Sequence, residues 1–94
     1  MKTVWKFPIE ATDTQAIQMP RNARLLHVDV QGEGLTAQPA VWALVESEEP
    51  RTFRTLAVVG TGHHSEHVAK LPHVGSFLLG HGSLVFHVFD LGEA

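Results

Sequence analysis

Histidine is the residue type in this chain best placed to carry chemistry, because seven histidines occur among 94 residues. His63, His64 and His67 surround Glu66, and positions 63 and 67 would share one face of a single helical turn. Neutral imidazole is a common zinc ligand, so the three histidines are a candidate metal site, with Glu66 as a further ligand or base. The pattern lacks the long helix of a metalloprotease motif. The alternative is a solvated loop whose histidines bind nothing.

The glycines that precede these histidines indicate a second candidate site, for an anionic ligand. Gly60, Thr61, Gly62 and His63 follow an apolar stretch, and successive backbone N–H groups in a glycine turn can hold an anion. Arg54, in the preceding stretch, would add positive charge. No long helix and no lysine-serine pair follow, so the segment matches neither a dinucleotide fingerprint nor a P-loop. The alternative is a tight turn that needs glycine only for its backbone angles.

These residues must be positioned by β-strands, because apolar and polar residues alternate along most of the chain. The first two strands are expected to form a hairpin, with Pro8 marking an edge strand. We expect Leu26, Val28 and Val30 to share one face of their strand, and Leu84, Phe86 and Val88 to point into a shared interior. The predicted strands are residues 3–9, 17–20, 23–31, 40–46, 51–59, 73–79 and 83–91.

Three segments carry more specific expectations. Residues 40–46 are apolar on both faces, as in a central strand that is covered on both sides. Residues 80–82, Gly-His-Gly, predict the tight turn of a closing hairpin, and the glycine-rich residues 32–39 form the most expendable loop. His87 lies in a predicted strand, where we expect a half-buried or surface histidine with one hydrogen-bond partner.

Together these patterns predict an all-β fold, a small antiparallel β-sandwich or open barrel of six to seven strands with at most one short helical turn. With 94 residues there is room for one core, so residues 1–94 are expected to form a single β-rich domain. The chain has no cysteine for a disulfide or thiolate site. It has no apolar run of about 20 residues for a membrane helix and no signal-peptide core, so we expect a cytoplasmic protein. A net charge of −3 makes nucleic acid an unlikely partner.

The sequence resembles a family of small uncharacterised proteins of tailed bacteriophages and prophages. The resemblance rests on residues 41–45 (VWALV), 51–54 (RTFR), 59–63 (VGTGH) and 84–89 (LVFHVF), and it extends to the opening MKTVWKF and to QAIQMP at 15–20. It implies a protein that acts inside an infected bacterial cell and binds something rather than converting it. The chain departs from the family pattern around residues 34–38 and at the His63-His64 pair, where the family more often has one histidine followed by proline.

We therefore expect a phage-encoded binding or accessory protein, not an enzyme, that needs no cofactor and forms a homodimer or higher oligomer. Its target would be a host protein or a small nucleotide ligand, and in one version of this hypothesis binding that target counters a bacterial antiviral defence. The alternatives are a small metal-dependent hydrolase that uses the loop at residues 63–67, and a virion or assembly component.

Overall fold

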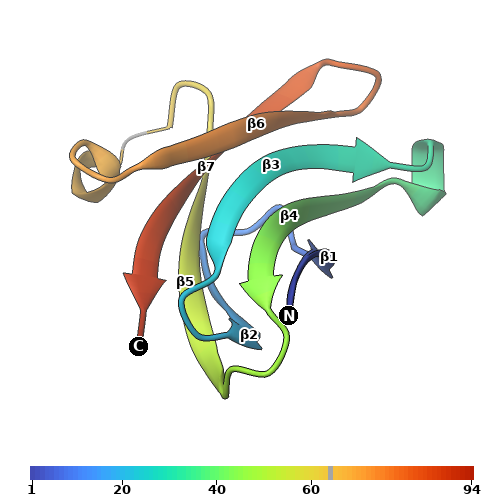
Figure 1. Ribbon diagram of the computed structural model, residues 1–94. Helices are drawn as coiled ribbons and strands as arrows, with labels where there is room; N and C mark the ends of the chain where they lie inside the picture. Colours follow the sequence, from blue (N-terminus) through green and yellow to red (C-terminus); the bar gives the residue numbers. More distant parts are fainter. Residues whose placement is uncertain (64) are drawn as a thin grey trace.

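The computed structural model describes residues 1–63 and 65–94, and in these residues it contains seven β-strands (Figure 1). The alternation of apolar and polar residues produces strands with one buried and one exposed face. This architecture confirms the predicted all-β class. The elements are β1 (Lys2–Pro8), β2 (Thr14–Pro20), β3 (Arg24–Gln31), the 3-10 turn η1 (Gly34–Thr36), β4 (Gln38–Glu46), β5 (Arg51–Gly60), the 3-10 turn η2 (Glu66–Val68), β6 (His73–Leu79) and β7 (Leu84–Glu93).

The strands form two antiparallel sheets, a three-stranded sheet of order β1-β4-β3 and a four-stranded sheet of order β2-β5-β7-β6. β1 is an edge strand, as Pro8 predicted. The hairpin predicted for the first two strands is wrong, because β1 pairs with β4 and β2 pairs with β5. Ile9 lies where the chain passes from β1 in one sheet to β2 in the other. Its side chain is buried and its N–H donates to Pro39 O at 3.0 Å.

The core lies between the two sheets and contains side chains from both. Burying each of its large apolar side chains contributes about 1.5–3 kcal/mol to stability. Phe77 is fully buried, and its ring stacks on Phe86 at a centroid distance of 5.2 Å. The buried members of the main cluster are Ile9, Val28, Val41, Leu56, Val58, Phe77 and Val88, and a second cluster contains Met19, Ala23, Ala43 and Val45.

In each of the two predicted groups, all residues except one leucine lie together on the inward face. The pairing of β3 with β4 shifts between Leu25 and His27, and this β-bulge turns Leu25 inward and leaves Leu26 41% exposed. Leu84 is 53% exposed because it is the first residue of β7, next to the turn and beyond the edge of the core.

The predicted central strand is β4, and only one of its faces is buried. Val41, Ala43 and Val45 point into the core, whereas Trp42 and Leu44 lie half-buried on the opposite face. The second cover that the sequence predicted is not supplied by any strand or turn of the described residues.

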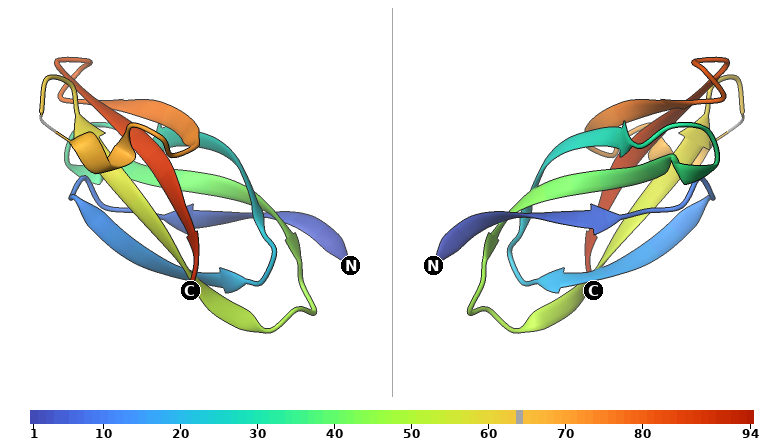
Figure 2. Two further views of the ribbon diagram at one scale, coloured as in Figure 1. Left: turned by 90° about the vertical axis from the view of Figure 1, so that its left-hand side faces the viewer. Right: turned by 90° about the vertical axis from the view of Figure 1, so that its right-hand side faces the viewer.

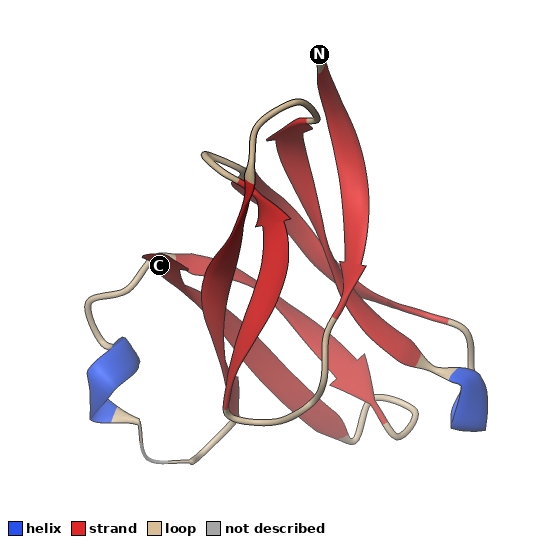
Figure 3. Cartoon of the chain, turned by 90° about the horizontal axis from the view of Figure 1, so that it is seen from below, coloured by secondary structure: helices blue, strands red, loops and turns tan. Residues whose placement is uncertain are grey.

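Two glycine-containing connections, the β3–β4 connection and the β6–β7 turn, lie close together in the structure. Both views in Figure 2 place η1 and the β6–β7 turn at the same end of the molecule, far from the N-terminus. Figure 3 shows η1 and η2 on opposite sides of the sandwich. The η2 turn falls where one helical turn was predicted, whereas η1 lies in a loop for which none was predicted.

Candidate functional site

The predicted anion-binding turn at Gly60–His63 follows the end of β5. Its backbone donors are largely used inside the protein, because Thr61 N–H donates to Val85 O and His63 N–H donates to Gly60 O, each at 3.0 Å. The His63 ring folds back onto Gly60, where a Cβ would lie 3.0 Å from the imidazole. Gly62 has a φ of +86°. The glycines thus serve the geometry of the turn, and anion binding there stays a prediction.

Arg54, the predicted cation of that site, lies elsewhere on β5. Its Nε–H donates to Asp90 Oδ1 at 2.9 Å, its Nη2 to Asp90 Oδ2 at 2.6 Å and its Nη1 to Ala23 O at 2.7 Å. The guanidinium lowers the pKa of the Asp90 carboxyl, and Asp90 raises the pKa of Arg54. Because Arg54 and Gly60 are six residues apart on an extended strand, about 20 Å separates them. Arg54 therefore joins β5, β7 and the β2–β3 connection and does not reach the turn.

The predicted metal site lies partly outside the described residues, which do not include His64. His63, Ser65 and His67 line a pocket of about 360 Å³ together with Asp13 from the β1–β2 connection. His67 Nδ1 is 3.1 Å from Ser65 Oγ. Within residues 1–63 and 65–94, no three histidine or acidic side chains are arranged to hold a metal ion. The site of three histidines stays a prediction.

His87 has two hydrogen-bond partners, where the sequence predicted one. Thr61 Oγ1 is 2.8 Å from its Nε2 and Ser76 Oγ is 2.9 Å from its Nδ1. Because the Thr61 hydroxyl donates to Val85 O at 3.3 Å, we assign the His87 proton to Nε2 and let Ser76 donate to Nδ1. Both ring nitrogens are therefore occupied. Through its bond to Thr61, His87 connects β7 to the turn that follows β5. Thr61 and Ser76 are distant in sequence, so no local pattern marks this contact.

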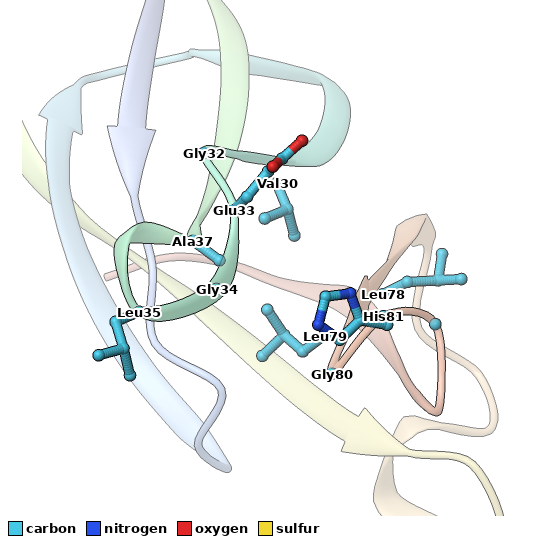
Figure 4. Close-up of a pocket in the computed structure, with 11 residues that line it drawn as sticks. Val30, Gly32, Glu33, Gly34, Leu35, Ala37, Leu78, Leu79, Gly80 and His81 are labelled. Carbon is cyan, nitrogen blue, oxygen red and sulfur yellow. The ribbon is translucent and has the colours of Figure 1, made fainter.

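A cavity of about 790 Å³ forms an open groove between the β3–β4 connection and the β6–β7 turn (Figure 4). Figure 4 shows Leu79 pointing across the groove toward the η1 turn, whereas Leu35 points away from it. Four glycines line the groove, and because glycine has no side chain, the backbone is accessible there. The lining residues are Val30, Gly32, Glu33, Gly34, Leu35, Ala37, Leu78, Leu79, Gly80, His81 and Gly82.

The groove exists because β3 and β6 meet without pairing. They touch where Gly75 lies against Val28, since a Cβ on Gly75 would be 3.3 Å from Val28 Cβ. Toward Val30 and Leu78 the strands line opposite walls of the groove. Within the described residues β3 pairs only with β4 and β6 only with β7, so each strand has one edge without ladder partners.

The two free edges differ in how they are protected. On β3, the N–H of Val30 donates to Asp29 Oδ1 at 2.8 Å, which occupies a donor of that edge. On β6, no backbone hydrogen bond from the described residues occupies the edge away from β7. An unprotected edge is a template for a further strand. β3 lies against this edge at Gly75, so the edge is open at the groove, where Leu78 and Leu79 line an apolar wall.

Sequence reasoning missed this groove. It treated residues 32–39 as an expendable loop and residues 80–82 as a turn, and it could not place them at one end of the molecule. A signal was present in Leu35, a leucine within a glycine-rich loop, which is fully exposed in the structure.

A family model for a domain of unknown function, DUF7352, matches residues 1–94. The chain belongs to this family. No curated protein and no solved structure shows significant similarity to it. In the described residues, no helix has the length and apolar character needed to cross a membrane. Family membership therefore assigns no activity, and the function must be inferred from the geometry.

Proposed function

We propose that the protein is a non-catalytic binding module that captures an extended segment of another protein. The segment adds to the free edge of β6 as a further strand and lies in the groove beside η1. The observation that carries this proposal is the unprotected edge of β6 beside an apolar groove of about 790 Å³. Strand addition is a recurring mode of peptide recognition in which backbone hydrogen bonds supply affinity and pockets for alternate side chains supply specificity.

The lining of the groove selects the chemistry of the segment. In an added strand every second side chain would point into the groove and meet Val30, Ala37 and Leu79, so apolar residues are favoured at alternate positions. Glu33, at the rim, favours a lysine or arginine at one end of the segment. β3 lies against β6 at Gly75, and Leu78 and Leu79 are the residues of β6 that line the groove, so the paired segment is short and the interface is small. We expect a dissociation constant in the micromolar range, roughly −8 kcal/mol.

A peptide library displayed on particles tests the proposal with the intact protein. Selection should enrich sequences with alternating apolar residues and a basic end. Backbone N-methylation of a selected peptide at one set of alternate residues should abolish binding, and methylation of the other set should leave it, because only one set faces β6. Equal loss for both sets, or no enrichment, would contradict strand addition.

Two variants separate the groove from the rest of the surface. Ala37→Arg places a long charged side chain in the groove and should weaken peptide binding at least about tenfold. Phe53→Arg is the control, because Phe53 is 51% exposed on β5 and does not line the groove, so peptide binding by this variant should be unchanged. Equal weakening by both variants would place the contact elsewhere.

The resemblance to phage proteins supports a further part of the proposal. The chain would be encoded by a phage or prophage and act in the bacterial cytoplasm, where it would self-associate and bind a segment of a host protein, for example a component of an antiviral defence. A small nucleotide is the competing ligand class. Thermal shift with nucleotides distinguishes the two classes, since stabilisation by a nucleotide but not by the selected peptide would contradict a protein target.

Two other functions stay predictions from the sequence. One is a metal-dependent hydrolase that uses residues 63–67. The described part of the chain contains no group of three side chains that could hold its metal ion. A virion or assembly component would be found by mass spectrometry of purified particles.

A further inference from the structure

The outward face of the three-stranded sheet has an apolar centre that no other described element covers. Val4 of β1 lies directly opposite Leu44 of β4, and Trp42 lies between Lys6 and His27 in the same sheet. Val4 is 49% exposed, and Leu26, turned outward by the β-bulge, is 41% exposed. A contiguous apolar face on a small protein is typical of an interaction site.

We infer that this face is the contact between two copies of the chain in a homodimer. The inference gives a surface to the proposed self-association and is independent of the groove, which lies between the loops at one end of the molecule. Trp42 and Leu44 make β4 apolar on both faces, and that pattern belongs to a strand covered on both sides. One cover is the four-stranded sheet, and a second copy would supply the other.

The charges of this face favour a second copy over a nucleic acid. Three basic residues, Lys2, Lys6 and Arg24, share the face with two acidic residues, Asp29 and Glu46. Such a mixture offers no phosphate-binding patch. A two-fold interface must be self-complementary, because each surface meets its own copy, and a face that carries both signs around an apolar centre satisfies that condition.

The arrangement of the charges indicates the orientation of the two-fold axis. Lys6 lies on β1 and Asp29 on β3, at opposite edges of the sheet. An axis parallel to β4 would place β1 of one copy over β3 of the other. Lys6 of each copy would then lie over His27 of the second copy, two residues from Asp29 along β3, and the two Trp42 rings would meet at the centre. Aromatic rings at the centre of an interface often contribute much of the binding energy.

The size of the face sets the expected affinity. Three strands of about seven residues cover roughly 14 by 24 Å in projection. This area is below the roughly 800 Å² that each partner buries in a standard interface, so the dimer should dissociate on dilution. We expect a dissociation constant between about 10 µM and a few hundred micromolar.

Sedimentation equilibrium tests the inference over concentrations from about 5 µM to about 1 mM. The average mass should rise from the monomer value of 10.3 kDa toward twice that value. Val4→Glu should weaken the dimer at least about tenfold, and Leu26→Glu should act likewise. Phe53→Glu is the control, because Phe53 is 51% exposed on the other sheet and its dimer should be unchanged. A constant mass of 10.3 kDa across the range would overturn the inference.

Charge exchange tests the orientation. Lys6→Asp and Asp29→Lys should each weaken the dimer, and the double variant should restore it, because the pair is re-formed with its charges exchanged. Additive weakening in the double variant would overturn the proposed pairing. Val4→Glu should leave binding of the selected peptide unchanged. A result that contradicts the homodimer can therefore be distinguished from one that contradicts peptide binding in the groove.

Discussion

Replacing Asp90 by asparagine should destabilise the protein more than most single substitutions. Asp90 accepts two hydrogen bonds from Arg54, at 2.9 and 2.6 Å, and the side chains of both residues are only 14% and 13% exposed. In the Asp90→Asn variant the guanidinium keeps its bond to Ala23 O, and Glu93 at 3.5 Å is the remaining acidic group beside it among the described residues. The variant therefore leaves a largely buried cation without its main partner.

The expected magnitude follows from that loss. Breaking a buried ion pair by removing one partner costs about 3–5 kcal/mol, and the partial exposure and Glu93 reduce this to about 2–3 kcal/mol. A domain of this size has a total stability of roughly 5–14 kcal/mol. The melting temperature should fall by about 10–20 °C.

The pH dependence has a definite sign. Arg54 lowers the pKa of Asp90 in the folded protein, so the ionised carboxylate stabilises the fold. This contribution is fully present above the pKa of the unfolded chain, about 3.9, and is lost as the pH falls through the lowered folded value. The wild-type chain should therefore lose stability below about pH 4, and Asp90→Asn should lose less over the same range.

Urea unfolding at pH 7 and at a series of acidic pH values measures both effects. The midpoint should fall in the variant while the m-value stays constant, which identifies a change in stability rather than in compactness. A difference below about 0.5 kcal/mol at pH 7, or identical acid profiles for the two proteins, would refute the structural role of the Arg54–Asp90 pair.

Three further predictions follow from single contacts. Gly75→Val should destabilise the protein by about 1–3 kcal/mol, because even a Cβ would lie 3.3 Å from Val28 Cβ; an unchanged melting temperature would contradict the close approach of β3 and β6. His87→Ala should speed hydrogen exchange at the Thr61 amide, which donates to Val85 O of β7. Exchange of the Val58 amide, which donates to Asp13 O, is the internal control and should be unchanged. An equal Thr61 exchange rate in the two proteins would contradict the anchoring role of His87. Zinc titration calorimetry tests the loop at residues 63–67, and the absence of heat at micromolar zinc would contradict the metal prediction.

The fold class was predictable from the sequence because period-two alternation is a local signal. The alternation predicted the positions of the strands and most of their buried residues, and the Gly-His-Gly segment predicted the closing hairpin. The β-bulge at Leu26 was not predictable, because the extra residue is defined by the register with β4. The prediction that the first two strands form a hairpin was wrong for a related reason. Ile9 is buried in the core where the chain passes from one sheet to the other, and nothing near it in the sequence distinguishes such a passage from a hairpin turn.

The sites were less predictable than the fold. The sequence grouped Arg54 with the Gly60 turn, but the extended strand between them holds the two apart, and Asp90 binds the guanidinium. The groove is formed by two loops about 45 residues apart that meet only because the two sheets pack against each other. Local patterns identified the turn residues, whereas their assembly into a cavity required tertiary structure.

The measurement that most directly tests binding at the groove is an amide NMR titration of the isotope-labelled protein with a selected peptide. The resonances of residues 30–37 and 76–82 should shift in proportion to occupancy, and the β6 amides on the free edge should become protected from exchange. Shifts confined to residues 60–67, or to the outward face of the three-stranded sheet, would contradict strand addition at β6.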